Sequence, residues 1–211
     1  IGRLEASLSP VMARRLLDAE WCSFEGLVFG EVLDRSRHLR PRKEYINQIN
    51  DNWDRYWCFD FGYDDAFTFH IFAKNPDKEQ YVCYKYICHT GRTINEHAEQ
   101  IRDITIGEPR PKLIVADRNP ESIAILESEL KMNILSAKKG PGSIKAGCNV
   151  LIDMLKNDEL VFLEDSIVEE DPKMRIKKQP IGFIEEAENY RWDLTKTDEV
   201  PIGGQDHCID A

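Results

Sequence analysis

Three short runs rich in aromatic and β-branched residues place the strongest constraint on how this chain folds. They cover residues 55–61, 66–73 and 80–88, and turn-forming residues at 62–65 and 75–78 separate them. Runs of this composition are typical of β-strands, and short connections of this kind favour antiparallel neighbours. The spacing therefore predicts a three-stranded antiparallel meander.

Helices and strands alternate after the meander. Thr93 and Glu96 form a capping box ahead of an apolar helical pattern, and Asn119 with Pro120 begins another helix directly after a buried strand over 112–116. Further expected elements are a strand over 133–137, a helix over 143–156, a strand over 160–163, an exposed hairpin or loop over 164–179 and a helix over 183–190. This order predicts an α/β fold with a mixed central sheet, an antiparallel three-strand meander and helices on both faces.

The segment that precedes the meander has a different character. Ser9 and Pro10 are suited to begin a helix, and residues 34–43 form an irregular basic stretch. Two interpretations of the basic stretch remain open: a solvated linker, or a strip that contacts phosphates. We expect residues 1–50 to be separate from a main domain over 51–211.

Charge limits the way in which this chain could bind nucleic acid. The 211 residues carry a formal net charge of −10, which excludes a globally basic binding surface. DNA binding would need a local basic patch or a bound metal ion. The sequence contains no apolar run of the roughly 20 residues that span a bilayer, so we expect no membrane association.

The six cysteines are scattered, and no CxxC pair occurs. A zinc site made of Cys83, Cys88, His89 and His97 is conceivable, but a regular strand over 81–88 would point the two thiols to opposite faces. We therefore expect most cysteines to be buried free thiols that pack as small hydrophobic groups.

Three aspartates stand at the ends of expected elements. Asp60 ends the first strand inside an aromatic run, Asp117 follows a later strand, and Asp210 lies in the closing segment three residues after His207. An unpaired carboxylate inside an aromatic run would be costly, and strand ends of an open sheet meet in a shared crevice. Oxygen donors with one imidazole suit Mg²⁺ or Mn²⁺. Like charges brought together should raise the pKa of at least one carboxyl group.

Five motifs occur in an order that resembles the nuclease domain of large terminase subunits of tailed bacteriophages. They are Trp57-Cys58-Phe59-Asp60-Phe61-Gly62-Tyr63, Val115-Ala116-Asp117, Ala137-Lys138-Lys139-Gly140-Pro141-Gly142-Ser143-Ile144, Glu188-Asn189-Tyr190-Arg191-Trp192 and Asp206-His207-Cys208-Ile209-Asp210-Ala211. The resemblance covers about residues 53–211 and implies the RNase H-like fold. The opening segment, with Trp21, Gly26 and Phe29, resembles the end of the ATPase motor domain that precedes the nuclease in this family.

The resemblance implies a catalytic site with two metal ions. Asp60 would be the ligand shared by both ions, Asp117 would complete one ion, and Asp210 with His207 would complete the other. The implied activity is endonucleolytic hydrolysis of concatemeric double-stranded DNA with little sequence specificity, in the cytoplasm of an infected bacterial host. The implied partners are DNA, the ATPase motor domain, the small terminase subunit and the portal.

Two basic segments are candidates for DNA contact. Lys138, Lys139, Ser143 and Lys145 surround an expected strand-to-helix turn, where backbone amides and lysines could lie near phosphates. The charged stretch contributes Lys173, Arg175, Lys177 and Lys178, at the place where the family carries a hairpin beside the DNA groove. An ordinary turn and a solvated edge explain these residues nearly as well. The phosphate-binding pattern GxxxxGK[ST] is absent, so we expect no ATP binding.

Two alternative functions remain open from the sequence. Another RNase H-like nuclease, such as a junction resolvase or transposase, would use the same carboxylates on a different DNA substrate. A module that grips DNA for the motor, with a purely structural acidic cluster, would bind duplex DNA without cutting it.

Overall fold

The computed structural model describes residues 26–195 and 200–211, so the helix expected at Ser9 and the motif residue Trp21 lie outside the described part. Within these residues seven strands form one mixed sheet in the order β1-β7-β4-β3-β2-β5-β6. Their bounds are β1 (Leu39–Arg40), β2 (Asp54–Asp60), β3 (Phe67–Asn75), β4 (Gln80–His89), β5 (Leu113–Ala116), β6 (Leu135–Ser136) and β7 (Leu160–Leu163).

The central strands confirm the expected meander. β2 pairs antiparallel with β3, and β3 pairs antiparallel with β4. The outer strands are all parallel to their neighbours: β5 to β2, β6 to β5, β7 to β4 and β1 to β7. Parallel pairing needs a crossover connection, and helices supply most of these connections.

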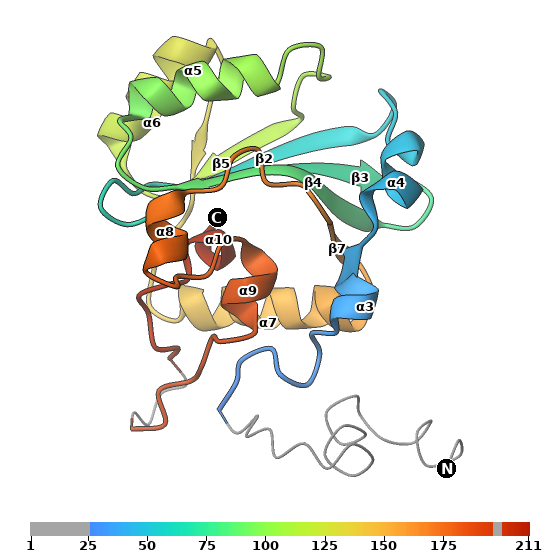
Figure 1. The fold of residues 1–211 in the computed structure, drawn as a ribbon, viewed down its shortest axis with the longest axis vertical. Coiled ribbons are helices and arrows are strands. Elements are labelled where there is room, and N and C mark those ends of the chain that lie inside the picture. The colour runs from blue at the N-terminus through green and yellow to red at the C-terminus, as the bar shows by residue number, and fades with distance from the viewer. Residues whose placement is uncertain (1–25, 196–199) are drawn as a thin grey trace.

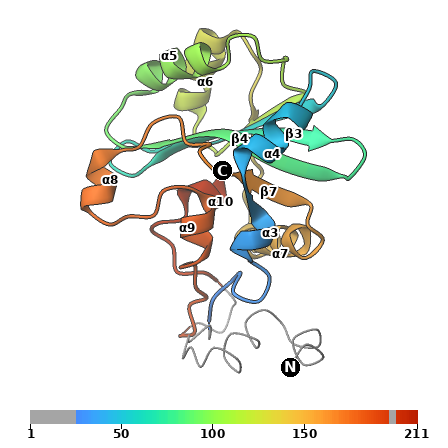
Figure 2. The same cartoon turned by 45° about the vertical axis from the view of Figure 1, so that its right-hand side comes forward.

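Helices cover both faces of the sheet, as expected (Figure 1). The helices are α3 (Arg35–His38), α4 (Arg42–Tyr45), the 3₁₀ turn η1 (Ile46–Gln48), α5 (Ile94–Ile104), α6 (Pro120–Leu130), α7 (Ser143–Lys156), α8 (Pro172–Ile176), α9 (Phe183–Ala187) and α10 (His207–Asp210). α5 and α6 lie on one face, whereas α7, α9 and α10 lie on the other, and the turned view shows the same layers (Figure 2). The expected caps are confirmed: Thr93 and Glu96 form the capping box of α5, and Asn119 caps α6.

Alternation along β2 divides its side chains between two cores. Trp57 and Phe59 join the core under α5 and α6, where the rings of Phe59 and Phe69 stack with centroids 4.6 Å apart. Successive side chains of a strand point to opposite faces, so Cys58 and Asp60 face the layer of α7 and α10. The aromatic run therefore supplies one core and leaves its carboxylate on the other face.

A β-bulge in β4 overturns one expectation about the cysteines. Ile71 pairs with Lys85 and Phe72 pairs with Cys83, which leaves Tyr84 as an extra residue in β4. The bulge shifts the alternation by one residue. Cys83 and Cys88 consequently belong to the same buried core, not to opposite faces.

The basic stretch before the meander folds against the sheet. Arg35 pairs with Glu188, and Arg37 pairs with Asp158 at 2.8 Å. The Arg42 guanidinium donates to the backbone oxygen of Tyr84. Several of the basic side chains considered for a solvated linker or a phosphate strip are thus engaged within the chain.

The stretch 164–179, expected as an exposed hairpin or loop, is mostly a loop that contains the short helix α8 and is partly buried. Asp171 is 1% exposed and accepts hydrogen bonds from the amide and hydroxyl of Thr90 and from the amide of Lys173. These bonds fasten the start of α8 to the end of β4, and Met174 is buried beneath the helix. No helix in the described ranges has both the length and the apolar character that crossing a membrane would require.

We predict that Gly62→Ala destabilises the fold. A Cβ at Gly62, just beyond Asp60, would lie 2.6 Å from the backbone oxygens of Asp65 and Ala66. Forced contacts of this kind cost about 1–3 kcal/mol. Gly147→Ala is the matched control, because a Cβ there meets open space inside α7 and should stabilise the helix by up to about 1 kcal/mol. Urea unfolding measures both changes, and equal effects would contradict the steric argument.

Candidate metal centre

The last residue of β2 provides the central carboxylate. Asp60 is 7% exposed and pairs in register with Thr68 of the neighbouring strand. The Thr68 hydroxyl donates to the backbone oxygen of His207 at 3.0 Å. The end of the β2–β3 pair therefore holds both a carboxylate and the start of α10.

Parallel pairing brings the second carboxylate to the same edge. Ala116, the last residue of β5, lies in register with Phe59, and the Asp117 amide donates to the Phe59 backbone oxygen at 3.0 Å. Parallel neighbours end at the same edge of a sheet. Asp117 consequently stands beside Asp60, although the two aspartates are far apart in the sequence.

The closing helix adds the imidazole and the third carboxylate. His207 Nδ1 lies 3.2 Å from Asp60 Oδ2, and this hydrogen bond raises the pKa of His207. Asp210 follows three residues later in α10, which places both side chains on one side of the helix. The structure therefore brings together the four residues that were predicted from the sequence to bind metal.

A lysine ammonium lies among these carboxylates. Lys139 Nζ is 2.6 Å from Asp117 Oδ1. Its pKa is raised first by this hydrogen bond and further by the charges of Asp117, Asp210 and Asp60. Contact of Lys139 with DNA stays a prediction, and in the structure the ammonium of this residue pairs with Asp117. The negative charge of the aspartates therefore stabilises a cation at this position.

Burial and the neighbouring negative charges together raise the pKa of Asp210. Its pKa is raised to about 6, first because the carboxyl group is partly withdrawn from water and then by the charges of Asp206, Asp60 and Asp117. Lys139 opposes the shift. At least one carboxyl group therefore has a raised pKa, as expected, although burial contributes more to the shift than the expected repulsion between like charges.

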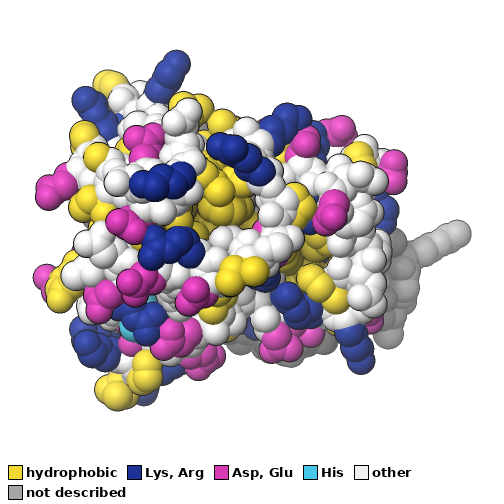
Figure 3. Space-filling view, turned by 90° about the horizontal axis from the view of Figure 1, so that it is seen from above, with side chains coloured by type: hydrophobic (Ala, Val, Ile, Leu, Met, Phe, Trp, Pro, Cys, Tyr) yellow, Lys and Arg dark blue, Asp and Glu magenta, His cyan; other side chains and the backbone are white. Residues whose placement is uncertain are grey.

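Two of the carboxylates, those of Asp117 and Asp210, face a cavity of about 930 Å³. Asp117, Lys139 and Asp210 line it together with apolar side chains of the sheet and of α7, such as Tyr56 and Leu151. On the face of the molecule that carries α5 and α6, acidic and basic side chains are interspersed (Figure 3). Mixed charge of that kind is typical of a solvated surface.

The residues expected to contact DNA fall in two separate places. Lys138 and Lys145 are exposed around the start of α7, near Lys139, and the Ser143 hydroxyl accepts from the Gly140 amide at 3.4 Å. Lys173, Arg175, Lys177 and Lys178 are exposed on and after α8. Arg175 already pairs with Glu170 and Glu185.

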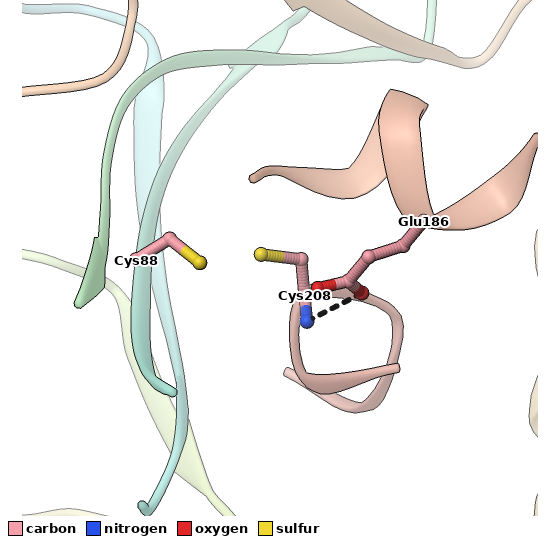
Figure 4. A group of neighbouring side chains, drawn as sticks. All are labelled: Cys88, Glu186 and Cys208. Carbon is pink, nitrogen blue, oxygen red and sulfur yellow. Dashed lines mark hydrogen bonds between the residues drawn. The ribbon is translucent and has the colours of Figure 1, made fainter. Parts of the chain in front are cut away.

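Sequence reasoning missed a buried group beside α10. Cys88 of β4, Glu186 of α9 and Cys208 of α10 are all buried, and the two sulfur atoms point toward one another (Figure 4). The possible ligand atoms of these three residues all lie within 4.8 Å of one another. Among the described residues no three of Asp60, Asp117, His207 and Asp210 have ligand atoms as close together as these. Burial raises the pKa of Glu186 well above its usual range. Nothing in the run Phe183-Ile184-Glu185-Glu186-Ala187 distinguishes the buried glutamate from its neighbour.

The two candidate groups suit different ions. The buried cysteines and Glu186 offer three donors, whereas a closed zinc site takes four. The aspartates with His207 offer oxygen donors and one imidazole, which suit Mg²⁺ or Mn²⁺. Because a lysine ammonium already lies among them, the aspartates are the better fit for a divalent cation.

No family model matches the chain, and the search of curated proteins gives no match. Solved structures do match. The large terminase of a thermophilic bacteriophage aligns with 100% of this chain at 16% identity and a TM-score of 0.67. This chain spans about half of that protein, 49% of its length.

Isolated nuclease domains match as well. The P22 large terminase nuclease domain has a TM-score of 0.61 at 12% identity and covers 89% of each chain. The SPP1 large terminase nuclease domain, solved with bound Mn, has a TM-score of 0.53 at 20% identity and covers 82% of this chain and 91% of that one. The described chain thus has the RNase H-like fold of the nuclease domain of phage large terminases.

Proposed function

We propose that this chain is the endonuclease domain of a phage DNA-packaging terminase, which hydrolyses phosphodiester bonds of concatemeric double-stranded DNA with two Mg²⁺ or Mn²⁺ ions. The observation that carries the proposal is the Lys139 ammonium among the carboxylates of Asp60, Asp117 and Asp210, on the fold of terminase nucleases. A cluster that already attracts one cation has the donors that hard divalent ions take.

Each residue has a separate task in this proposal. Asp60 would be the ligand shared by both ions, Asp117 would complete one ion, and Asp210 with His207 would complete the other. Bound ions would activate water and stabilise the leaving oxygen of the phosphodiester. Asp60 also orients His207 through the hydrogen bond to Nδ1, which leaves the other ring nitrogen for an ion.

Lys139 would change partners when metal arrives. Its ammonium neutralises Asp117 in the structure, and an ion on Asp117 would free it for a phosphate. Lys138, Ser143 and Lys145 surround the same turn, so a phosphate path would run past the start of α7. Contacts to the backbone carry no base information, which supports low sequence specificity. Lys173, Arg175, Lys177 and Lys178 would form a second contact, for which Arg175 must leave Glu170 and Glu185.

This chain aligns with a full-length terminase, and its wider setting is proposed from that similarity. Because it spans about half of the terminase from the thermophilic phage, we propose an ATPase motor domain in the intact protein. The small terminase subunit and the portal are further proposed partners, and the cytoplasm of an infected bacterium is the proposed place of action. Preference for four-way junctions would favour a resolvase, and duplex binding without cleavage would favour a DNA-gripping module.

We expect Asp60→Asn to reduce plasmid cleavage by more than about 100-fold. Mutation of a residue that only hydrogen-bonds to a metal ligand already lowers metal affinity or activity roughly 10–100-fold. His207→Ala should have a smaller effect, since Asp210 remains. The assay follows nicking and linearisation of supercoiled plasmid with Mg²⁺, Mn²⁺, Ca²⁺ or EDTA. Asp64→Asn, in the exposed loop after β2, is the control and should cut like the wild type. Equal activity of Asp60→Asn and Asp64→Asn would refute the assignment.

Protons and metal should compete at Asp210. Its pKa of about 6 means that the carboxyl group is charged above pH 6 and protonated below it. Mn²⁺ affinity should therefore weaken about tenfold for each pH unit below 6. Titrations followed by Mn²⁺ electron paramagnetic resonance at pH 5, 6 and 7.5 measure the effect. Asp206→Asn removes a charge that raises the pKa of Asp210. In this variant the loss of Mn²⁺ affinity should therefore begin at a lower pH than in the wild type. An affinity independent of pH over this range would contradict the prediction.

Lys138→Ala should weaken binding to duplex DNA by a similar factor for unrelated sequences. The slope of log affinity against log salt concentration should fall in magnitude by about one, because one phosphate contact is lost. The matched control is Lys156→Ala, at the other end of α7 and roughly 20 Å along the helix. Fluorescence anisotropy with two unrelated 30-mers across a salt series gives both quantities. A loss confined to one sequence, or equal losses for Lys138→Ala and Lys156→Ala, would argue against contact with phosphates at this turn.

A further inference from the structure

The helix that carries His207 and Asp210 is only four residues long, so its position depends on contacts with neighbouring elements. A single turn is not stable by itself. Thr68 holds the backbone oxygen of His207 at 3.0 Å, and the Tyr190 hydroxyl donates to Asp206 at 3.1 Å. A third contact comes from Glu186, which is also buried.

The carboxyl group of Glu186 accepts two hydrogen bonds from the backbone of α10. Its Oε2 atom receives the amide of Cys208 at 2.8 Å and the amide of Ile209 at 3.0 Å. Figure 4 shows the bond to Cys208 and the approach of the glutamate from α9. Glu186 is 2% exposed, so water cannot readily replace these bonds. The first amides of a helix often lack a partner within the helix, and a carboxyl oxygen can accept from them. The Ile209 amide is shared, because it also donates to the backbone oxygen of Asp206 at 3.0 Å.

The helix that carries Glu186, α9, is itself held in place by packing against the sheet. α9 packs through Phe183, whose ring stacks on Phe162 of β7 with centroids 4.6 Å apart. Ala187 and Ile184 are buried in the same core. A continuous path of packed groups therefore leads from the sheet through α9 to the backbone of α10.

We propose that Glu186 is a positioning residue, which fixes the backbone of α10 so that His207 and Asp210 face Asp60 for metal binding. The inference rests on the proposed function, because it concerns the same metal centre. Glu186 touches neither Asp60 nor Asp117 through any hydrogen bond that the structure records, and its effect passes through the amides of Cys208 and Ile209.

Four variants test this role. Glu186→Gln keeps an oxygen at the same reach, Glu186→Asp shortens the side chain by one methylene, and Glu186→Ala removes the acceptor. Glu188→Gln, at the exposed end of α9, is the control. Mn²⁺ affinity is measured by electron paramagnetic resonance, and hydrogen exchange of the peptide over 205–211 is measured by mass spectrometry.

We expect Glu186→Ala and Glu186→Asp to weaken Mn²⁺ binding about 10–100-fold and to speed amide exchange in α10. Glu186→Gln should restore both quantities to within about threefold of the wild type, and Glu188→Gln should change neither. If Glu186→Ala fails to fold, the comparison of Glu186→Asp with Glu186→Gln decides. Wild-type Mn²⁺ affinity in Glu186→Asp, or an equal loss in Glu186→Gln and Glu186→Asp, would overturn the positioning role.

Asp60→Asn in the same series separates the two proposals. Loss of Mn²⁺ binding in Asp60→Asn with wild-type binding in Glu186→Asp would overturn the positioning role alone. Equal Mn²⁺ binding by the wild type and Asp60→Asn would overturn the metal centre and the positioning role together.

Discussion

The pairing of β2 with β5 is the constraint on which the candidate site depends. In a parallel pair the two chains run in the same direction, so their last residues meet at one edge. The register of Phe59 with Ala116, continued by the amide of Asp117, places Asp60 and Asp117 side by side. The meander fixes β2 from its other side through β3. The remaining site residues are arranged around this pair of strand ends.

Gathering carboxylates at one edge has an electrostatic cost, and the structure offsets it in three ways. Lys139 contributes a positive charge at Asp117, and His207 shares a hydrogen bond with Asp60. Asp210 has a raised pKa and so retains its proton to higher pH than an ordinary aspartate does. Each arrangement is one that a divalent cation could replace. Under the proposed function, bound metal would neutralise the acidity near the site in a chain whose net charge is −10.

The second constraint is the chain of contacts that holds α10. Buried aromatic rings fix α9 on the sheet, and Glu186 extends that rigidity to the amides of α10. Thr68 adds a bond from β3. A site assembled from strand ends thus takes its last two candidate ligands from a short segment that depends on others for its position.

Much of the architecture follows from local patterns in the sequence. Alternating aromatic residues predicted β2 and its neighbours, the Thr93–Glu96 capping box predicted α5, and Asn119 with Pro120 predicted the start of α6. These signals work because strand alternation and helix capping involve residues close in sequence. The bulge at Tyr84 and the anchoring of α8 by Asp171 carry no such signal, because the partner strand or loop decides both.

The sequence by itself determined the candidate ligands, since Asp60 within an aromatic run, Asp117 after an apolar strand and the His207–Asp210 spacing are all local features. Only the tertiary structure decided that these side chains meet, that the exposed Lys139 side chain pairs with Asp117, and that Glu186 holds the helix bearing two of them. The physical reason is that strand register, burial and long-range hydrogen bonds depend on residues far apart in the chain. Residues far apart in the chain come into contact only when the sheet has formed.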